Sequence, residues 1–314
     1  MSHQEDPYYD PHWPCARDWL AGDYLAKATK SLAVLGVPTT RGSLPPCQCE
    51  LAPQAVRNGL HHFSTYDLSA ARDLRHLRAK DAGDLPIVAL MPQEAFQPIR
   101  DAVAELLKDV NAAVLLGGDN SLTAAGVHGM SVPLDRCGLL SFDAHFAHFD
   151  LGDLDSGLNN RNSTRALLRD GLQGDHIYKI GLQRFANSDA YAKVARTAGI
   201  HIITSDQVMD LGITKAVHTA LGHLHLHADR IYVSVDMDVL DRIHAPAAND
   251  SLPGGLFPGQ MRRAAHLCGL HPKVRVMDLT ELDPTRDVAD ITSMTAATCL
   301  LEFAAGVLSR PVHA

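Results

Sequence analysis

Continuous apolar runs of a few residues recur along the chain and alternate with segments whose apolar residues are spaced as on one face of a helix. The runs predict strands that are buried on both faces, as strands of a parallel sheet are. They cover residues 31–36, 86–91, 112–116, 138–142, 176–181, 200–204, 230–235 and 274–279, and helices are predicted at 93–111, 190–198 and 259–270. This alternation predicts an α/β fold of three layers, α/β/α, around an eight-stranded, mostly parallel sheet.

The domain organisation predicted from the pattern is simple. Residues 26–314 contain no internal repeat and no Pro/Gly-rich linker, so they are expected to form a single α/β domain. Residues 1–25 are interrupted by Pro7, Pro11 and Pro14 and are predicted to be an N-terminal arm outside the core.

Composition narrows the classes of function. The 314 residues include 28 Lys and Arg against 36 Asp and Glu, a net charge of −8, and only 5% are aromatic. A negative chain without a basic block is a poor partner for nucleic acid or anionic lipid. We expect no membrane span, because no apolar stretch of about 18 residues is present.

Cysteine usage indicates the compartment. The first residues lack the basic and apolar regions of a signal peptide, and the six cysteines are scattered. A chain of this size does not need disulfides, so a cytoplasmic location is expected. The pair Cys47 and Cys49 is too closely spaced, and too isolated, to favour a metal site.

Polar clusters follow several of the predicted strands, where sites of parallel sheets lie. Asp143 and His145 follow one strand, Asp236 and Asp238 another, and Glu281 a third. Residues spaced i, i+2 in extended chain share a face, so each pair can point to one place. Buried carboxylates need a cation, and oxygen donors with one imidazole suit Mn²⁺, Zn²⁺, Fe²⁺ or Ni²⁺. The alternative is that these acids only cap the following helices.

Several segments around these clusters resemble motifs of the ureohydrolase family, which includes arginase, agmatinase and formiminoglutamase. The similarity covers roughly residues 31–306. The matching segments are Gly36-Val37-Pro38, Ala52–Arg57 (GPxAIR), Asp81–Asp84 (DxGD), Gly117–Thr123 (GGDHSLT), Asp143–His145 (DAHxD), Ser234–Asp241 (SxDxDxxDP), Ala245-Pro246 with Pro253–Leu256, and Glu281–Asp287 (ExxPxxD).

The resemblance implies a metal centre with one departure. Enzymes of the family carry two adjacent ions, usually Mn²⁺, bridged by an activated water. Two ligands of one ion are replaced here by Asn120 and Ala147, whereas Asp143, His145, Asp236 and Asp238 match the other ion without change. We therefore expect one complete site and one degenerate site, with one Mn²⁺ or Zn²⁺ per chain.

Weak extra donors for the degenerate site remain open. Asn120 offers a neutral amide oxygen, and His148 or, with a local insertion, Asp150 could replace the missing carboxylate.

The resemblance also implies site roles. Asp143 and His145, as part of the catalytic set, would hold the metal whose bound water is the nucleophile, and Glu281 would pair with the guanidinium or amidine of the substrate. The histidine that shuttles protons in the family is absent from residues 159–162. Asn160, Arg184 and Arg161 could bind an acidic substrate at the mouth of the site, or could simply be solvated.

Three hypotheses follow. The first is a hydrolase of a non-peptide C–N bond in a guanidino or amidino compound, acting through one metal-bound water. The second is a catalytically silent homologue that binds or regulates a partner such as an active paralogue. The third is altered chemistry on an amide or acetylamide, since related histone deacetylases use one Zn²⁺. Family resemblance implies a homo-oligomer, a trimer or hexamer.

A histidine-rich stretch stands apart from these motifs. It contains His218, His223, His225 and His227. At a period of two the last three could bind a surface ion; the alternative is a solvated face.

Overall fold

The computed structural model describes residue 10, residues 12–147 and residues 157–311. A single eight-stranded sheet forms its centre, with the strand order β4-β1-β5-β10-β9-β6-β7-β8. All of its strand pairs are parallel. The strands are β1 (Lys30–Val37), β4 (Leu77–Asp84), β5 (Ala112–Gly117), β6 (Cys137–Phe142), β7 (Ile177–Leu182), β8 (His201–Thr204), β9 (Arg230–Asp236) and β10 (Val274–Thr280), with a small hairpin of β2 (Tyr66–Asp67) and β3 (Arg72–Asp73).

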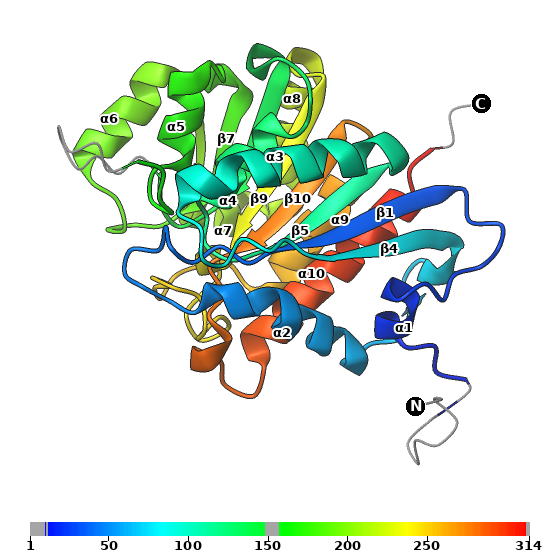
Figure 1. Ribbon diagram of the computed structural model, residues 1–314. Coiled ribbons are helices and arrows are strands. Elements are labelled where there is room, and N and C mark those ends of the chain that lie inside the picture. Colours follow the sequence, from blue (N-terminus) through cyan, green and yellow to red (C-terminus); the bar gives the residue numbers. More distant parts are fainter. Residues whose placement is uncertain (1–9, 11, 148–156, 312–314) are drawn as a thin grey trace.

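Helices cover both faces of this sheet (Figure 1). The helices are α1 (Ala16–Leu20), α2 (Ala52–Gly59), α3 (Pro92–Asp109), α4 (Leu122–His128), α5 (Ser163–Asp170), α6 (Asp189–Ala198), α7 (Ser205–Leu211), α8 (Ile213–His227), α9 (Pro258–Leu270) and α10 (Ile291–Leu308). One buried cluster packs α1, α2 and α7–α10 on one face, and a second packs α3–α6 on the other. The three-layer prediction is confirmed.

Helix α10 is long and apolar enough to resemble a membrane span, which the sequence analysis did not anticipate. Its 18 residues have a mean hydropathy of 1.5, but 67% of them are buried. It packs mainly against α9 and next against α2, within the buried cluster on one face of the sheet, as the core helix of a layered fold does.

The strand predicted at residues 86–91 is wrong. That segment forms a turn leading into α3, and the edge strand is β4, which reads Leu-Arg-Ala-Lys-Asp-Ala-Gly-Asp. Only Leu77 and Ala79 are buried on β4, because an edge strand at the rim of the sheet covers little core. Its polar alternation hid it from a search for continuous apolar runs.

The prediction that residues 1–25 form an arm outside the core is wrong for residues 16–20. Helix α1 buries Ala16, Trp19 and Leu20 in the core, and the Trp19 indole Nε1 donates to the carbonyl of Leu77 at 2.9 Å. Cys15 pairs with Ser64 in an isolated antiparallel bridge. This part of the predicted arm is therefore integral to the domain.

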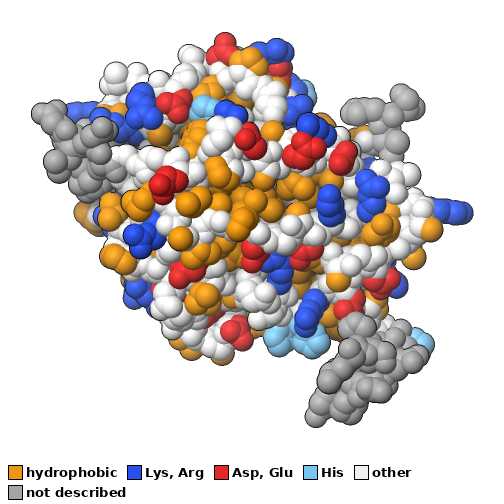
Figure 2. Space-filling model, in the orientation of Figure 1, with side chains coloured by type: hydrophobic (Ala, Val, Ile, Leu, Met, Phe, Trp, Pro, Cys, Tyr) orange, Lys and Arg blue, Asp and Glu red, His pale blue; other side chains and the backbone are white. Residues whose placement is uncertain are grey.

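Charged side chains of both signs are interspersed on the face shown in Figure 2, and hydrophobic side chains gather in a band across its middle. No extended single-sign area is visible on this face.

Candidate active site

Four adjacent central strands, β5, β10, β9 and β6, deliver the predicted residues to one edge of the sheet. Their carboxyl ends carry Asn120, Glu281, the Asp236–Asp238 pair and the Asp143–His145 pair, respectively. The chain passes very close to Thr39 at the end of β5. A Cβ on Gly118 would stand 1.7 Å from the Thr39 carbonyl oxygen, so only glycine fits there.

Three of the four predicted metal ligands converge, and the fourth, Asp236, lines the same cavity. Ligand atoms of Asp143, His145 and Asp238 all lie within 4.8 Å of one another. His145 Nδ1 lies 2.6 Å from Asp238 Oδ2, and the amide of Asp238 donates to Asp236 Oδ1 at 3.0 Å. The three carboxylates are buried and the imidazole is about one-third exposed at 33%. This is an oxygen-rich set with one nitrogen donor, as the sequence analysis predicted.

The electrostatics of these residues show that they are short of positive charge. Burial raises the pKa of Asp236 well above its usual value, and the neighbouring Asp238 and Asp143 raise it further. Burial lowers the pKa of His145, but the carboxylates around it, Asp238 foremost and then Asp143, together raise this pKa to about 9. A bound cation would relieve the repulsion among these carboxylates.

The two departures from the family motifs lie beside this cluster. Asn120 Nδ2 donates to Asp236 Oδ2 at 3.1 Å, and Asn120 Oδ1 accepts from the hydroxyl of Thr123 at 2.9 Å. Its side chain is therefore already engaged within the protein. Ala147 lines the same cavity and offers no donor atom. His148 and Asp150, considered as replacement ligands, lie outside the described residues.

A buried lysine, which the sequence analysis missed, reaches the cluster from β7. Lys179 is 1% exposed, and its Nζ donates to Asp143 Oδ2 at 2.9 Å and to the Ser141 hydroxyl at 3.1 Å. Lys179 of β7 pairs in register with Ser141 of β6, two residues before Asp143, and this register brings its Nζ within reach of the Asp143 carboxylate. The other oxygen of Asp143 accepts the His145 amide at 2.6 Å. The ammonium supplies one fixed positive charge to this group of acids.

Glu281 is held in an unusual backbone conformation with φ +63°, which ordinary side chains rarely adopt. Its Oε1 accepts a hydrogen bond from the backbone amide of Asn120 at 2.7 Å, and its Oε2 accepts one from the side-chain amide of Asn249 at 3.5 Å. Burial, and next the charge of Asp119, raise the pKa of Glu281 to about 8.

These residues share one cavity of about 360 Å³, which suits a small ligand. Its described lining comprises Asn120, Asp143, His145, Phe146, Ala147, Asn160, Arg161, Phe185, Ala186, Asn187, Tyr191, Asp236, Asp238, Asn249, Asp250, Leu252 and Glu281.

The residues expected to bind substrate separate into two places. Asn160 lines the cavity, and its Oδ1 accepts a hydrogen bond from the backbone amide of Leu44 at 3.0 Å. Arg184, by contrast, is not among the described lining residues: its side chain is 74% exposed and pairs with Asp206 at 3.4 Å. Gln183 before it is buried, so the chain turns the next side chain outward. Arg161 lies in the wall instead, 2.5 Å from Asp250 Oδ2.

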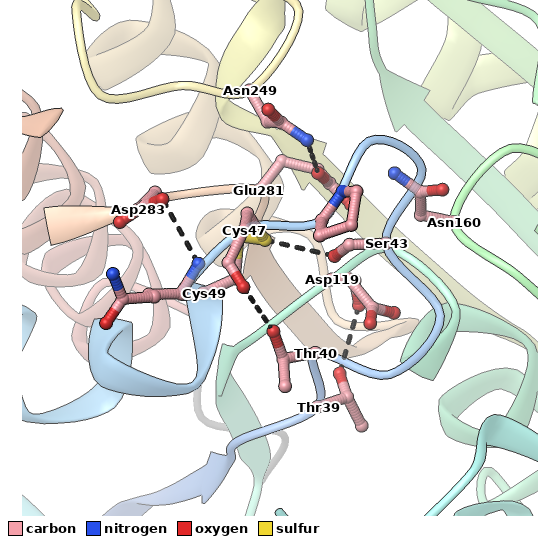
Figure 3. The surroundings of a disulfide bond; sticks show 12 residues. Thr39, Thr40, Ser43, Cys47, Cys49, Asp119, Asn160, Asn249, Glu281 and Asp283 are labelled. Atoms are coloured by element: carbon pink, nitrogen blue, oxygen red, sulfur yellow. Dashed lines mark hydrogen bonds between the residues drawn. A yellow bond between two sulfur atoms is a disulfide. The ribbon is translucent and has the colours of Figure 1, made fainter. Parts of the chain in front are cut away.

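The segment after β1 packs against the Glu281 side of the site (Figure 3). Cys47 and Cys49 form a disulfide there, although a chain of this size was not expected to need one. The Ser43 hydroxyl lies 3.0 Å from Cys47 Sγ, and the Gln48 amide donates to Asp283 at 3.1 Å. Cys15, Cys137, Cys268 and Cys299 are free thiols.

Comparison with known proteins identifies the family of this chain. The model of the Arginase family matches residues 30–306. The chain belongs to the arginase family. The resemblance to ureohydrolases is thereby confirmed, and the protein is a hydrolase. It is 32% identical to the formimidoylglutamase of Halalkalibacterium halodurans over 304 residues, 96% of this chain and 94% of the relative.

Solved structures of this family have the same fold. The crystal structure of formimidoylglutamase from Bacillus subtilis aligns with a TM-score of 0.88 at 27% identity, over 99% of this chain and 98% of that one. Trypanosoma cruzi formiminoglutamase, solved with Mn2+2, aligns with a TM-score of 0.85 at 22% identity, over 95% and 100% of the two chains.

Some site residues of this arginase-family chain had little sequence signal. Lys179 had one: it is a lone charge inside an otherwise apolar strand, and such a side chain must find a buried partner. Asn187 had none, although it ties two neighbours of His145 together. Its Nδ2 donates to the Ala144 carbonyl, and its Oδ1 accepts from the Phe146 amide, each at 2.9 Å.

Proposed function

We propose that this arginase-family protein is a metal-dependent hydrolase that cleaves a non-peptide C–N bond in an amidino compound. The observation that carries the proposal is the shared cavity, which Asp143, His145, Asp236, Asp238 and Glu281 all line. Relatives named formimidoylglutamase support it.

The donor set fits a divalent ion such as Mn²⁺ or Zn²⁺, held by Asp143, His145, Asp236 and Asp238. When bound, such an ion supplies Lewis acidity and a water that ionises near neutral pH. We propose that this centre holds one ion in each chain. Asn120 donates to Asp236 rather than presenting a free lone pair, Ala147 has no donor, and Lys179 already carries positive charge to Asp143. The Trypanosoma cruzi relative, solved with Mn2+2 both as such and as a variant with histidine in place of an asparagine, makes two ions the competing outcome.

Glu281 is the residue that we assign to the amidine. Its Oε1 accepts a short hydrogen bond of 2.7 Å from the backbone amide of Asn120, whereas Oε2 accepts a long one of 3.5 Å from Asn249 Nδ2, so Oε2 is the oxygen that a ligand in the cavity would engage. A cationic amidinium beside it would lower its raised pKa and form charge-assisted hydrogen bonds. The φ of +63° at Glu281 fixes the direction of this carboxylate in advance.

The reaction balances without another reactant. Water adds its oxygen to the amidine carbon, the bond from that carbon to the substituted nitrogen breaks, and that nitrogen takes a proton. A formimidoyl amine would thus yield formamide and the free amine. The site's own contribution is to bind the amidinium at Glu281 and to keep the carboxylates of the metal cluster aligned.

We further propose that the substrate carries an acidic group besides its amidine, as formimidoylglutamate does. Arg161 is the one Arg or Lys among the described lining residues, and Asn160, Asn187 and Asn249 add amides. Asp250 balances Arg161 at 2.5 Å in the present arrangement and would have to share it with a substrate carboxylate.

The test compares purified protein on formimidoylglutamate, agmatine, arginine and an acetylated amine, with the products followed by NMR. Formamide released from formimidoylglutamate, and lost in Glu281→Gln with metal content unchanged, is the expected result. Loss of the metal together with the activity would instead assign Glu281 to the metal centre. Turnover of the acetylated amine alone would favour the deacetylase-like alternative.

A catalytically silent homologue would turn over none of these compounds even when loaded with metal. The relatives give that alternative no support. The expected homo-oligomer and the cytoplasmic location stay predictions, which size measurement and localisation in cells would test.

A further inference from the structure

A second group of metal-ligating side chains lies at the opposite end of the sheet from the candidate active site. It consists of Asp175, His201 and His223, here called the edge cluster. Asp175 belongs to the short helix η6 (Gly174–His176) before β7, His201 begins β8, and His223 lies in the last turns of α8. The three come from different elements but meet at the amino ends of the last two strands.

The ligand atoms of the edge cluster already converge. His201 Nε2 lies 2.9 Å from one Asp175 oxygen, and His223 Nε2 lies 3.3 Å from the other. All three ligand atoms lie within 4.8 Å of one another. A zinc ion with bonds of about 2.0–2.2 Å needs ligand atoms about 3.5 Å apart, so only small movements would be required.

Aromatic packing orients both imidazoles of the cluster. The Tyr178 ring stacks on His201 with centroids 4.3 Å apart at 11°, and lies 5.5 Å from His223. His227, one helical turn beyond His223, stacks on it at 4.3 Å and 22°. Because packing already restricts these rings, ligation would cost little further conformational entropy.

The helical conformation of α8 determines which histidines of the histidine-rich stretch lie together. Residues 223 and 227 share one face of α8, because helical neighbours recur at i+4. His225 points elsewhere and contacts His271, with ring centroids 5.3 Å apart. The period of two considered for His223, His225 and His227 therefore does not describe this stretch.

We propose that the edge cluster is a second metal site, which binds Zn²⁺ or a similar divalent transition ion through Asp175, His201 and His223. Two imidazoles and a carboxylate are donors that suit such ions. The side chains are partly exposed, at 56%, 33% and 24%, so water can complete the coordination.

A bound ion would act on structure rather than on the reaction. It would join β8, the four-residue strand at one rim of the sheet, to α8 and to the start of β7. An ion that binds only the folded chain shifts the unfolding equilibrium by one plus the ratio of its free concentration to its dissociation constant, which is about 100-fold at a concentration 100 times that constant. This proposal does not depend on the proposed amidino hydrolase activity.

The experiment counts Zn²⁺ bound to the full chain by elemental analysis after equilibrium dialysis. The double variant His201→Gln plus His223→Gln should bind one Zn²⁺ fewer per chain than the wild type. Zn²⁺ should also raise the Tm of the double variant by less than it raises the Tm of the wild type. His225→Gln is the matched control, on the same helix but outside the cluster, and should behave as the wild type.

A third variant guards against misfolding of the double variant. Asp175→Asn keeps the shape and a hydrogen-bonding group but removes the charge, and should weaken Zn²⁺ binding at this site more than tenfold. Co²⁺ spectra then report the site directly, because a tetrahedral or five-coordinate complex with two imidazoles absorbs in the visible range. Equal zinc counts in wild type and double variant, or an unchanged zinc affinity in Asp175→Asn, would overturn the proposal.

Discussion

Replacing Lys179 by methionine tests how the chain balances the charge of its metal cluster. Methionine keeps most of the volume of the side chain but removes the ammonium that donates to Asp143 Oδ2 at 2.9 Å. Removing one partner of a buried ion pair costs about 3–5 kcal/mol, because it leaves the other charge uncompensated. We expect that loss in the free energy of unfolding of the metal-free protein.

A bound divalent ion should reduce this cost. The ion then compensates Asp143, and the remaining loss is a charge-assisted hydrogen bond of about 1.5–3 kcal/mol. The difference of about 2 kcal/mol must appear in metal binding, since the thermodynamic cycle closes. It corresponds to about 30-fold tighter Mn²⁺ binding by Lys179→Met than by the wild type.

The assay is urea unfolding with EDTA and with saturating Mn²⁺, combined with calorimetric titration of Mn²⁺. Lys30→Met is the matched control: Lys30 Nζ donates to the Leu308 carbonyl, far from the cluster, so its loss should be the same with and without metal. Lys179→Gln, which keeps a neutral donor, serves if the methionine variant does not fold. Equal destabilisation in both conditions and an unchanged Mn²⁺ affinity would refute the reasoning.

Three further predictions concern the same molecule. In metal-free protein the pKa values of Glu281 (about 8) and His145 (about 9) are raised, so between about pH 5 and about pH 9 the folded state binds more protons than the unfolded state. The Tm should therefore fall as pH rises through this range. A flat or rising Tm in EDTA would contradict this. The double change Asn120→His plus Ala147→Asp, made together with His201→Gln and His223→Gln so that the edge cluster binds no ion, should raise bound Mn²⁺ from one to two per chain by elemental analysis. Asp tolerates the φ of +52° at residue 147, and a His201→Gln plus His223→Gln chain that already holds two ions would disprove the single-ion proposal. Trp19→Ala should lower the free energy of unfolding by about 3–5 kcal/mol in urea, because Trp19 is fully buried, whereas an independent arm would lose nothing.

The sequence predicted the sheet and the position of its site because both depend on local patterns. Strands buried on both faces read as apolar runs, and the residues after β6, β9 and β10 are visible one motif at a time. The edge strand β4 escaped, because its polar side chains reflect its place at the rim rather than its conformation. Helix α1 was not predicted, because it is only five residues long and follows a proline-rich segment, so the i, i+3 spacing of Ala16 and Trp19 is a weak helical signal.

Long-range relations could not be predicted in the same way. The sequence shows that Asn120 replaces a histidine, but not that its amide donates to Asp236. It shows a lysine in β7, but only the register with Ser141 places that lysine beneath Asp143. Arg184 lies two residues past the same strand, yet the chain turns its side chain to solvent.

The polar edge strand β4 also bears on how the protein avoids edge-to-edge aggregation through its sheet. It leaves Arg78, Lys80 and Asp81 exposed along an unpaired side of the sheet. Another chain that added a strand there would have to desolvate these charges, which disfavours intermolecular β-pairing. At the other rim, β8 is only four residues long and gives little template. The sheet can thus remain open on both sides without seeding fibrils.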